Sequence, residues 1–260
     1  MVEMKEPAFE VPLYLRRGAA RRDPVRQVYE ARWLLENMAK RTQTDLPVAS
    51  VLDVGCGVKF SQAIATYDIA IGSYVGIDID PEMIDFLAKT VDDQRFSFAS
   101  YDSENELYNP AGTKLSEYES LPTLRTDFDL ICGFSLFTHL DDDDFGAMLK
   151  LMARHGQPGT RLYFSCFINE QTPNGRGVIS RYSSAMGADE PPASSEIPPF
   201  LDMTTDEPLL HAVFSRQRVK EHVAASGWNL DVIFDPSGGD MDHDMSHPDI
   251  VQHQVICTLP

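Results

Sequence analysis

Apolar residues occur in short continuous runs that are separated by amphipathic segments. The runs predict buried strands at 49–54, 73–78, 95–99, 128–134 and 161–167. The segments between them space their apolar residues as a helix does, and they predict helices near 60–70, 80–90 and 141–154. Strands that are apolar on both sides must be covered on both faces. The alternation therefore predicts an α/β fold, a Rossmann-like three-layer sandwich around a mostly parallel sheet.

The N-terminal region has a helical pattern of its own. Asp23 followed by Pro24 is typical of a helix start, with an acidic cap and a proline at the first helical position. An apolar stripe at helical spacing then continues to Met38. We interpret residues 1–47 as an N-terminal arm and helix that form a lid or cap, and residues 48–260 as the main domain.

Residues 169–207 interrupt the alternation of strands and helices. They are rich in Pro, Gly, Ser and acidic residues, and they follow the end of a strand, where ligands bind in open α/β sheets. This position favours an insertion that acts as a substrate lid, with a disordered insertion as the alternative. Beyond it, the pattern predicts a helix at 215–226 and two final strands at 229–235 and 251–259.

Charge and composition exclude several classes of function. The 260 residues carry a net charge of −18, and a surface this acidic repels phosphate backbones, so we expect no nucleic-acid partner. No apolar run approaches the roughly 18 residues of a membrane span, and the N-terminus lacks the order of a signal peptide. The four cysteines fall in or beside predicted strands, which indicates reduced thiols in a cytoplasmic protein.

The first two predicted strands end in residues suited to an adenosine-bearing cofactor. Glycines at 55 and 57 follow the first strand and let a ligand approach the backbone closely. The second strand ends at Asp78, whose carboxylate can accept hydrogen bonds from ribose hydroxyls. Gly55 and Asp78 lie 23 residues apart, close to the spacing of about 20 within one βαβ unit.

Together with later segments, these motifs resemble the class I S-adenosylmethionine-dependent methyltransferases over roughly residues 48–260. Asp53, Gly55 and Gly57 match the family's Asp-x-Gly-x-Gly motif, and Asp78 matches the acid that ends its second strand. Asp102 is a looser match to an acid that often contacts adenine. Two further matching segments are Ser135-Leu136-Phe137-Thr138-His139-Leu140, after the fourth strand, and Gln157-Pro158-Gly159-Thr160, before the fifth.

The resemblance implies a seven-stranded sheet with an antiparallel last strand. It also implies S-adenosyl-L-methionine as the cofactor and S-adenosyl-L-homocysteine as its product. The cofactor-binding residues expected from it are Asp53, Gly55, Cys56, Gly57, Asp78, Ile79, Met83, Asp102, Phe134 and Ser135.

The chain departs from the family pattern at one position of the glycine turn. The family often has a third glycine two residues after Gly57, and here that residue is Lys59. Its stem either crowds the methionyl part of the cofactor or turns toward solvent. The basic cluster Arg16, Arg17, Arg21, Arg22 and Arg26 has two interpretations as well. It is either a solvated helix face or part of a lid that binds an anionic substrate or the cofactor's carboxylate.

Two histidines are candidates for a catalytic base. His139 follows the fourth predicted strand, and His211 follows the predicted lid. Each has a structural alternative, such as a bond to backbone groups. We expect no metal site, since Asp141–Asp144 are typical of a helix start. The acidic loop around 240–249 resembles a polar hairpin loop more than a calcium loop.

The combined motifs predict a methyltransferase that acts on a small molecule, a sugar or a biosynthetic intermediate, more readily at oxygen than at nitrogen. An NAD-dependent oxidoreductase is disfavoured because Phe60 stands where the last glycine of Gly-x-Gly-x-x-Gly belongs. Two further alternatives are a regulatory protein that binds the cofactor without turnover, and an enzyme that uses it for a displacement other than methylation. A membrane partner is not expected, and a homodimer is left open.

Overall fold

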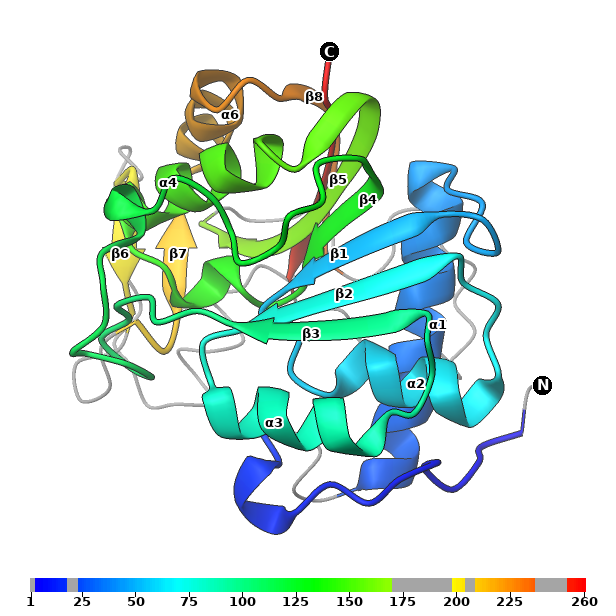
Figure 1. Ribbon diagram of the computed structural model, residues 1–260. Coiled ribbons are helices and arrows are strands. Elements are labelled where there is room, and N and C mark those ends of the chain that lie inside the picture. Colours follow the sequence, from blue (N-terminus) through cyan, green and yellow to red (C-terminus); the bar gives the residue numbers. More distant parts are fainter. Residues whose placement is uncertain (1–2, 18–22, 170–197, 204–208, 237–251) are drawn as a thin grey trace.

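A computed structural model describes residues 3–17, 23–169, 198–203, 209–236 and 252–260. Its described strands join one sheet, and five of them run parallel in the order β3-β2-β1-β4-β5 (Figure 1). Their bounds are β1 Ser50–Val54, β2 Ser73–Asp78, β3 Phe96–Ser100, β4 Phe128–Gly133 and β5 Gly156–Ile168. Each lies within a few residues of its predicted position.

The sheet continues beyond β5 through the last strand of the chain. That strand, β9 (His253–Thr258), pairs antiparallel with β5 on one side and with β8 (Asn229–Phe234) on the other. With the five parallel strands, β8 and β9 form the predicted seven-stranded, mostly parallel sheet with an antiparallel last strand. The three-layer fold class is thereby confirmed.

Two short strands were not predicted. β7 (Ala212–Phe214) pairs parallel with the end of β5, and β6 (Phe200–Asp202) pairs antiparallel with β7. Strands of three residues are too short to show a period, so their sequence carries no recognisable pattern. Most of the predicted lid 169–207 and the acidic loop 240–249 lie outside the described residues.

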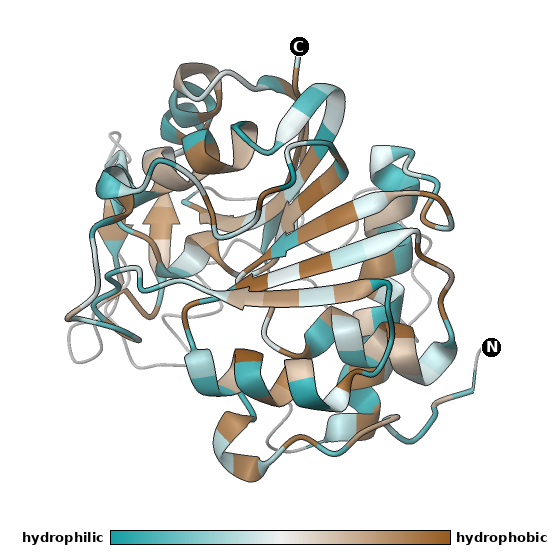
Figure 2. Ribbon diagram, viewed as in Figure 1, coloured by the Kyte–Doolittle hydropathy of each residue, from teal (hydrophilic) through white to brown (hydrophobic). Residues whose placement is uncertain are grey.

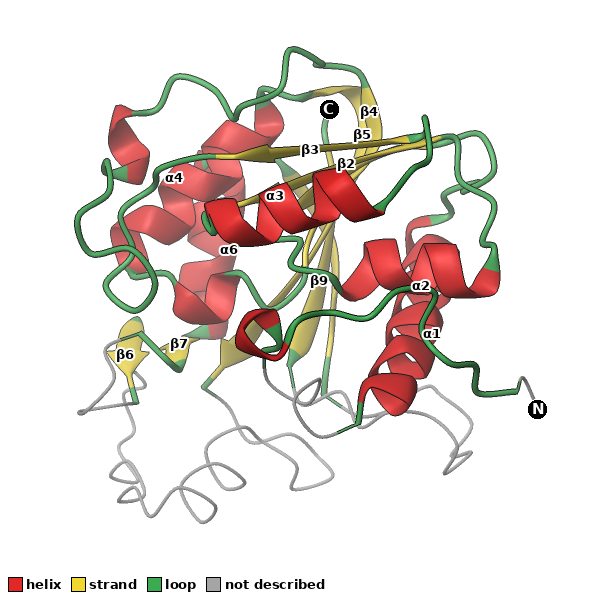
Figure 3. Cartoon of the chain, turned by 60° about the horizontal axis from the view of Figure 1, so that its bottom comes forward, coloured by secondary structure: helices red, strands yellow, loops and turns green. Residues whose placement is uncertain are grey.

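Helices cover both faces of the sheet (Figures 1 and 3). On one face, α1 (Pro24–Thr42) and α2 (Lys59–Tyr67) pack against residues of β1, β2 and β4 in a shared apolar cluster. On the other face, α4 (Asp142–Ala153) and α6 (Arg216–Ala225) share a second cluster with the same sheet. The remaining long helix, α3 (Pro81–Thr90), packs against the N-terminal segment through Val11 and Leu15.

Side-chain caps fix where the helices begin. Asp23, Asp80, Asp141 and Ser215 each accept a hydrogen bond from a backbone N–H of the first turn that follows, at 2.8 to 3.1 Å. These bonds satisfy donors that have no partner inside the helix. The acidic run 141–144 is therefore a helix start in the structure, as its sequence predicts.

Strand register brings the predicted site residues to one edge of the sheet. Asp53 of β1 lies opposite Gly76 of β2 and Cys132 of β4. Because the three strands are parallel, their carboxyl ends meet, and the loops that follow them face the same space. Apolar residues follow the lengths of these strands, as the brown bands of Figure 2 show. The apolar core therefore ends at the carboxyl ends of these strands, where the polar residues of the predicted site lie.

Candidate active site

The turn after β1 is shaped by two glycines with left-handed backbones. Gly55 has φ +72° and Gly57 has φ +47°, a region that favours glycine. The N–H groups of Gly55 and Cys56 donate to the carbonyl oxygen of Ile77 at 2.8 and 3.0 Å, which ties the turn to β2. A Cβ at Gly57 would meet no atom within 4 Å. The backbone at Gly57 is therefore open to a ligand.

Asp78, at the end of β2, is held beside this turn. Its Oδ2 accepts a hydrogen bond from the Gly57 N–H at 2.9 Å, and its Oδ1 accepts one from the Asp80 N–H at 3.1 Å. Nη1 of Arg17 lies 3.9 Å from the same Oδ1, and Nη2 of Arg17 donates to Oδ2 of Asp80 at 2.7 Å. The carboxylate is thus oriented by backbone donors and faces a cation from the N-terminal segment.

Asp53 lies almost fully buried at the end of β1. The Tyr74 hydroxyl donates to its Oδ2 at 2.5 Å, and the Cys132 thiol approaches Oδ1 at 3.5 Å. Burial raises the pKa of Asp53 to about 6, while the two hydrogen bonds oppose that shift. Asp53 therefore titrates close to neutral pH rather than as an ordinary aspartate.

Lys59 begins α2 and lies over the ring of Phe134. Its ammonium nitrogen is 4.2 Å from the ring centroid. Burial lowers the pKa of this amine to about 8, and the more distant carboxylates of Asp53 and Glu30 oppose the shift. Of the two sequence-based alternatives, the side chain therefore turns inward rather than to solvent.

The backbone after β4 is fixed by a small polar network. Ser135 has φ +59°, and its N–H donates to the hydroxyl of Ser165 on β5 at 2.8 Å. The Ser165 hydroxyl in turn donates to the amide oxygen of Gln252 at 2.5 Å, and the amide nitrogen of Gln252 donates to the Ser135 hydroxyl at 2.6 Å. Gln252, which directly precedes the last strand, thus helps to hold Ser135 in its left-handed backbone conformation.

His139 lies in the short 3-10 helix η4 (Phe137–His139), which follows this network. Its Nδ1 lies 3.1 Å from the carbonyl oxygen of Leu209. Because a carbonyl oxygen only accepts, Nδ1 carries the hydrogen and Nε2 is the basic nitrogen of the neutral ring. Burial lowers the pKa of His139, which keeps the ring neutral near pH 7. The ring packs edge-on against Tyr108 at 5.5 Å.

These groups surround one cavity of about 460 Å³. That volume lies within the range of small-molecule and cofactor sites. Nine of the ten residues expected to bind the cofactor line it, as does His139; the nine are Asp53, Gly55, Cys56, Gly57, Asp78, Ile79, Met83, Phe134 and Ser135. The turn after β1 and the ends of β2 and β4 are thus brought together as their motifs predict.

Two predicted site residues do not line the cavity. Asp102 is exposed, and its carboxylate accepts a hydrogen bond from the Asn109 amide at 2.8 Å. Its neighbours Tyr101 and Ser103 do line the cavity. His211 precedes β7, and its ring packs against Phe167 at 5.9 Å. For both, the side chain is directed by local packing that a position in the sequence does not reveal.

The N-terminal segment, which the sequence suggested as a lid or cap, contributes residues to this cavity, and most of them were not singled out from the sequence. Leu15, Arg17, Gln27 and Glu30 line it beside the turn after β1. Arg17 also lies 5.0 Å from the ring of Tyr108. The sequence signal for this contribution is the basic cluster that contains Arg17. One of its two interpretations was a lid that binds an anion.

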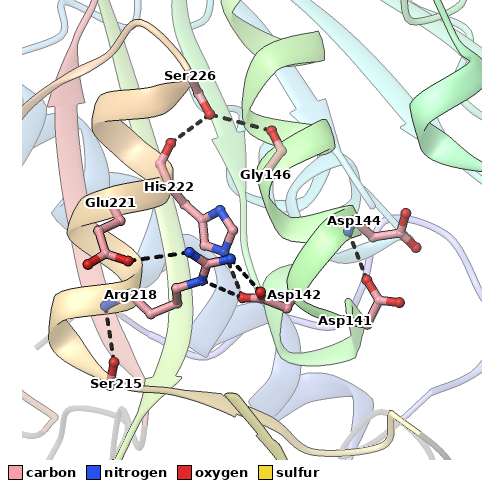
Figure 4. A network of polar contacts seen from close by, with 9 residues as sticks. All are labelled: Asp141, Asp142, Asp144, Gly146, Ser215, Arg218, Glu221, His222 and Ser226. Carbon is pink, nitrogen blue, oxygen red and sulfur yellow. Dashed lines mark hydrogen bonds and ion pairs between the residues drawn. The ribbon is translucent and has the colours of Figure 1, made fainter. Parts of the chain in front are cut away.

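A second polar network lies away from the cavity and joins α4 to α6 (Figure 4). Asp142 accepts two hydrogen bonds from Arg218, at 2.8 and 2.5 Å, and lies 2.8 Å from Nε2 of His222. The hydrogen bond to Arg218 contributes most to lowering the pKa of Asp142. The contacts of Asp142 with Arg218 and His222 join the two helices, so we interpret the network as a structural tie.

The chain matches known proteins over most of its length. A family model described as a methyltransferase domain matches residues 25–231. An S-adenosylmethionine-dependent methyltransferase from Aquifex aeolicus has a similar structure, with a TM-score of 0.52, 15% identity, and coverage of 92% of this chain and 94% of that chain. None of the described helices is long and apolar enough to cross a membrane.

Two similar structures contain the demethylated cofactor. Magnesium protoporphyrin IX methyltransferase from Synechocystis PCC 6803, with bound S-adenosylhomocysteine, has a TM-score of 0.52, 11% identity, and coverage of 91% of this chain and 87% of that chain. The glycopeptide N-methyltransferase MtfA, in complex with the same product, has a TM-score of 0.53, 14% identity, and coverage of 86% and 89%. At sequence identities of 11% to 15%, the similarity of these structures to the chain establishes a shared fold.

Proposed function

The chain belongs to the methyltransferase-domain family as a class I S-adenosylmethionine-dependent methyltransferase, and we propose that it methylates a small molecule at oxygen. We propose a sugar or a biosynthetic intermediate as the acceptor. The family assignment replaces the NAD-dependent oxidoreductase that the glycine turn alone had left open. The observation that carries the choice of oxygen is the neutral His139 in the wall of the cavity.

The residues around the cavity fit the cofactor of this family. Gly57 leaves its backbone open, and Asp78 has an oriented carboxylate that suits ribose hydroxyls. Ile79 and Met83 supply apolar surface beside Asp78, which suits an adenine ring. The bound cofactor supplies a methyl group on a positively charged sulfur. The protein must then hold the acceptor in line with that methyl and exclude water.

His139 is placed to remove a proton from a hydroxyl acceptor. A hydroxyl is a weak nucleophile until a base takes its proton, whereas a neutral amine needs no base. With Nδ1 bonded to the Leu209 carbonyl, Nε2 has the free electron pair that accepts that proton. The lowered pKa of His139 keeps this nitrogen available at neutral pH. A buried neutral histidine is therefore a reason to expect an oxygen nucleophile.

The N-terminal segment supports the proposed cap. Arg17 binds Asp80 and lies near Asp78, so residues before α1 cover the carboxylate that suits the ribose. Gln27 and Glu30 of α1 complete that side of the cavity. We propose that residues 1–47 close over the cofactor and help to keep water out.

Paired acceptors test the proposed function. The enzyme is incubated with S-adenosylmethionine and with small molecules that differ only in carrying a hydroxyl or an amine, and the methylated product is detected by mass spectrometry. Methylation of hydroxyl members that is lost in His139→Gln supports the proposal. Methylation of the amine members alone contradicts it. Cofactor binding with cleavage but without a methylated acceptor would favour a displacement other than methylation.

A further inference from the structure

Lys59 places a positive charge at the position where the glycine turn after the first strand often has a third glycine in the methyltransferase family. The residue begins α2 and lines the cavity, as Asp53 of β1 and Glu30 of α1 also do. Its ammonium contacts the face of Phe134, which lines the same cavity. The charge is thus held inside the cofactor cavity by an aromatic ring.

Among the described residues, this charge has no carboxylate in direct contact, although Asp53 and Glu30 act on it from a greater distance. Within the part of the chain that the structure describes, the Lys59 ammonium makes no hydrogen bond and no ion pair. The two carboxylates named above, those of Asp53 and Glu30, accept hydrogen bonds from other residues. Asp53 accepts from Tyr74 at 2.5 Å, and Glu30 accepts from Arg26 at 2.7 Å. A ring contact replaces only part of the hydration that a buried ammonium loses.

The surroundings of Lys59 favour an anion. No side chain caps the amino end of α2, because the residue at the cap position is Val58. The free N–H groups and the dipole of α2 therefore add positive potential next to the ammonium. Gly57, whose backbone is open, lies two residues away. A carboxylate placed here would gain an ion pair and backbone donors at once.

We propose that Lys59, together with the amino end of α2, binds the carboxylate of the cofactor's methionyl group. The proposal rests on the proposed function, because it takes S-adenosylmethionine as the ligand of the cavity. The cofactor then supplies the counter-charge that no described carboxylate provides in direct contact. An acceptor molecule with a carboxylate is the other source of the same chemistry, and the experiment below separates the two.

The test compares two ligands that differ only in this group. S-adenosylhomocysteine and its decarboxylated analogue are titrated calorimetrically into the wild type, Lys59→Met and Lys59→Arg. Methionine keeps an apolar stem of similar length without the charge. We expect Lys59→Met to weaken S-adenosylhomocysteine at least about tenfold, equivalent to about 1.4 kcal/mol, and the decarboxylated analogue by less than about twofold. Lys59→Arg should keep the preference for the carboxylate.

A pH series gives a second readout. The affinity of the wild type for S-adenosylhomocysteine should fall as the pH rises through about 8, since Lys59 loses its proton there, and Lys59→Met should show no such fall. Equal weakening of both ligands, or no weakening of either, overturns the proposal. If Lys59→Met instead weakens only the binding of an acceptor that has a carboxylate, then Lys59 binds the carboxylate of the acceptor and not that of the cofactor. A wild type that binds neither ligand contradicts the proposed function itself.

Discussion

The Tyr74 hydroxyl and the Asp53 carboxylate form a 2.5 Å hydrogen bond that links the first part of β2 to the end of β1. Both side chains are almost fully buried, and they join neighbouring strands beside the glycine turn. The bond stabilises the ionised form of Asp53, whereas burial stabilises the protonated form. Burial dominates, and it leaves Asp53 with a pKa of about 6.

Asp53 should make stability depend on pH between about 4 and 6. Its pKa is higher in the folded chain than in the unfolded chain, so the folded state binds more protons across this window and loses stability as the pH rises. The shift corresponds to roughly 3 kcal/mol. Urea unfolding of Asp53→Asn and the wild type should show a difference in unfolding free energy that grows from pH 4 to 6 and is constant above. A constant difference throughout would show that folding does not raise the pKa of Asp53.

The Asp78 carboxylate should be needed for cofactor affinity. Asp78→Asn loses the negative charge and replaces one of the two acceptor oxygens by an NH2 donor, so S-adenosylhomocysteine should bind at least about tenfold more weakly by calorimetry. Asp102→Asn is the matched control, because Asp102 is exposed and outside the cavity. We expect it to change the affinity by less than about twofold. Equal losses in the two variants would mean that the ribose lies elsewhere.

Gly57 should matter more for ligand binding than for folding. A methyl group at Gly57 meets no protein atom, so Gly57→Ala costs only the left-handed backbone, about 1–2 kcal/mol. The same methyl would extend into the cavity and should weaken S-adenosylhomocysteine at least about tenfold.

Gly76→Ala provides the contrast for Gly57→Ala. Its Cβ would lie 2.9 Å from both the Cys56 sulfur and the Phe98 ring, so unfolding free energy should fall by about 1–3 kcal/mol through overpacking. Thermal unfolding and calorimetry on both variants separate the two effects. A stable Gly57→Ala that binds with wild-type affinity would show that the ligand does not approach this backbone.

His139 should act on turnover rather than on cofactor binding. Removal of a general base should lower kcat for a hydroxyl acceptor by about 10²–10⁴ in His139→Gln, with the affinity for S-adenosylhomocysteine unchanged. Since the pKa of His139 is lowered, the acidic limb of the wild-type rate profile should have its midpoint below the ordinary imidazole value of about 6.5. His211→Gln is the control and should keep the rate, because His211 does not line the cavity. A loss of rate in His211→Gln alone would transfer the role to that residue.

The sequence was most informative where a motif combines a strand end with a backbone requirement. Gly55, Gly57 and Asp78 line one cavity because apolar strands fix where chain segments end and parallel strands end together, and their part in cofactor binding stays a prediction. The same logic could not orient Asp102 or His211, since a residue after a strand turns inward or outward according to contacts made far away in the chain. Their proposed roles had rested on position alone.

Long-range contacts also explain the features that were missed. Arg17 and Asp78 are far apart in the sequence, and neither gives a sign of the other. The pair β6 and β7 depends on the end of β5, where Phe167 and Ile168 pair with β7, and not on any pattern of its own. Lys59 was recognised as a departure from the family, but only its contact with Phe134 shows which way it turns.

The link from Gln252 to Ser135 and Ser165 has a consequence for how the enzyme is made. Gln252 directly precedes β9, which follows every other described strand in the chain and inserts between β5 and β8. During synthesis, the earlier strands can pair before this part leaves the ribosome, and β5 then has an uncovered edge. The Ser135 N–H can already meet the Ser165 hydroxyl of β5, but the Gln252 amide that ties the two serine hydroxyls together arrives only with β9. The catalytic cavity is therefore among the last parts of the protein to mature, and a nascent chain stalled before residue 252 should hold most of the fold without a finished active site.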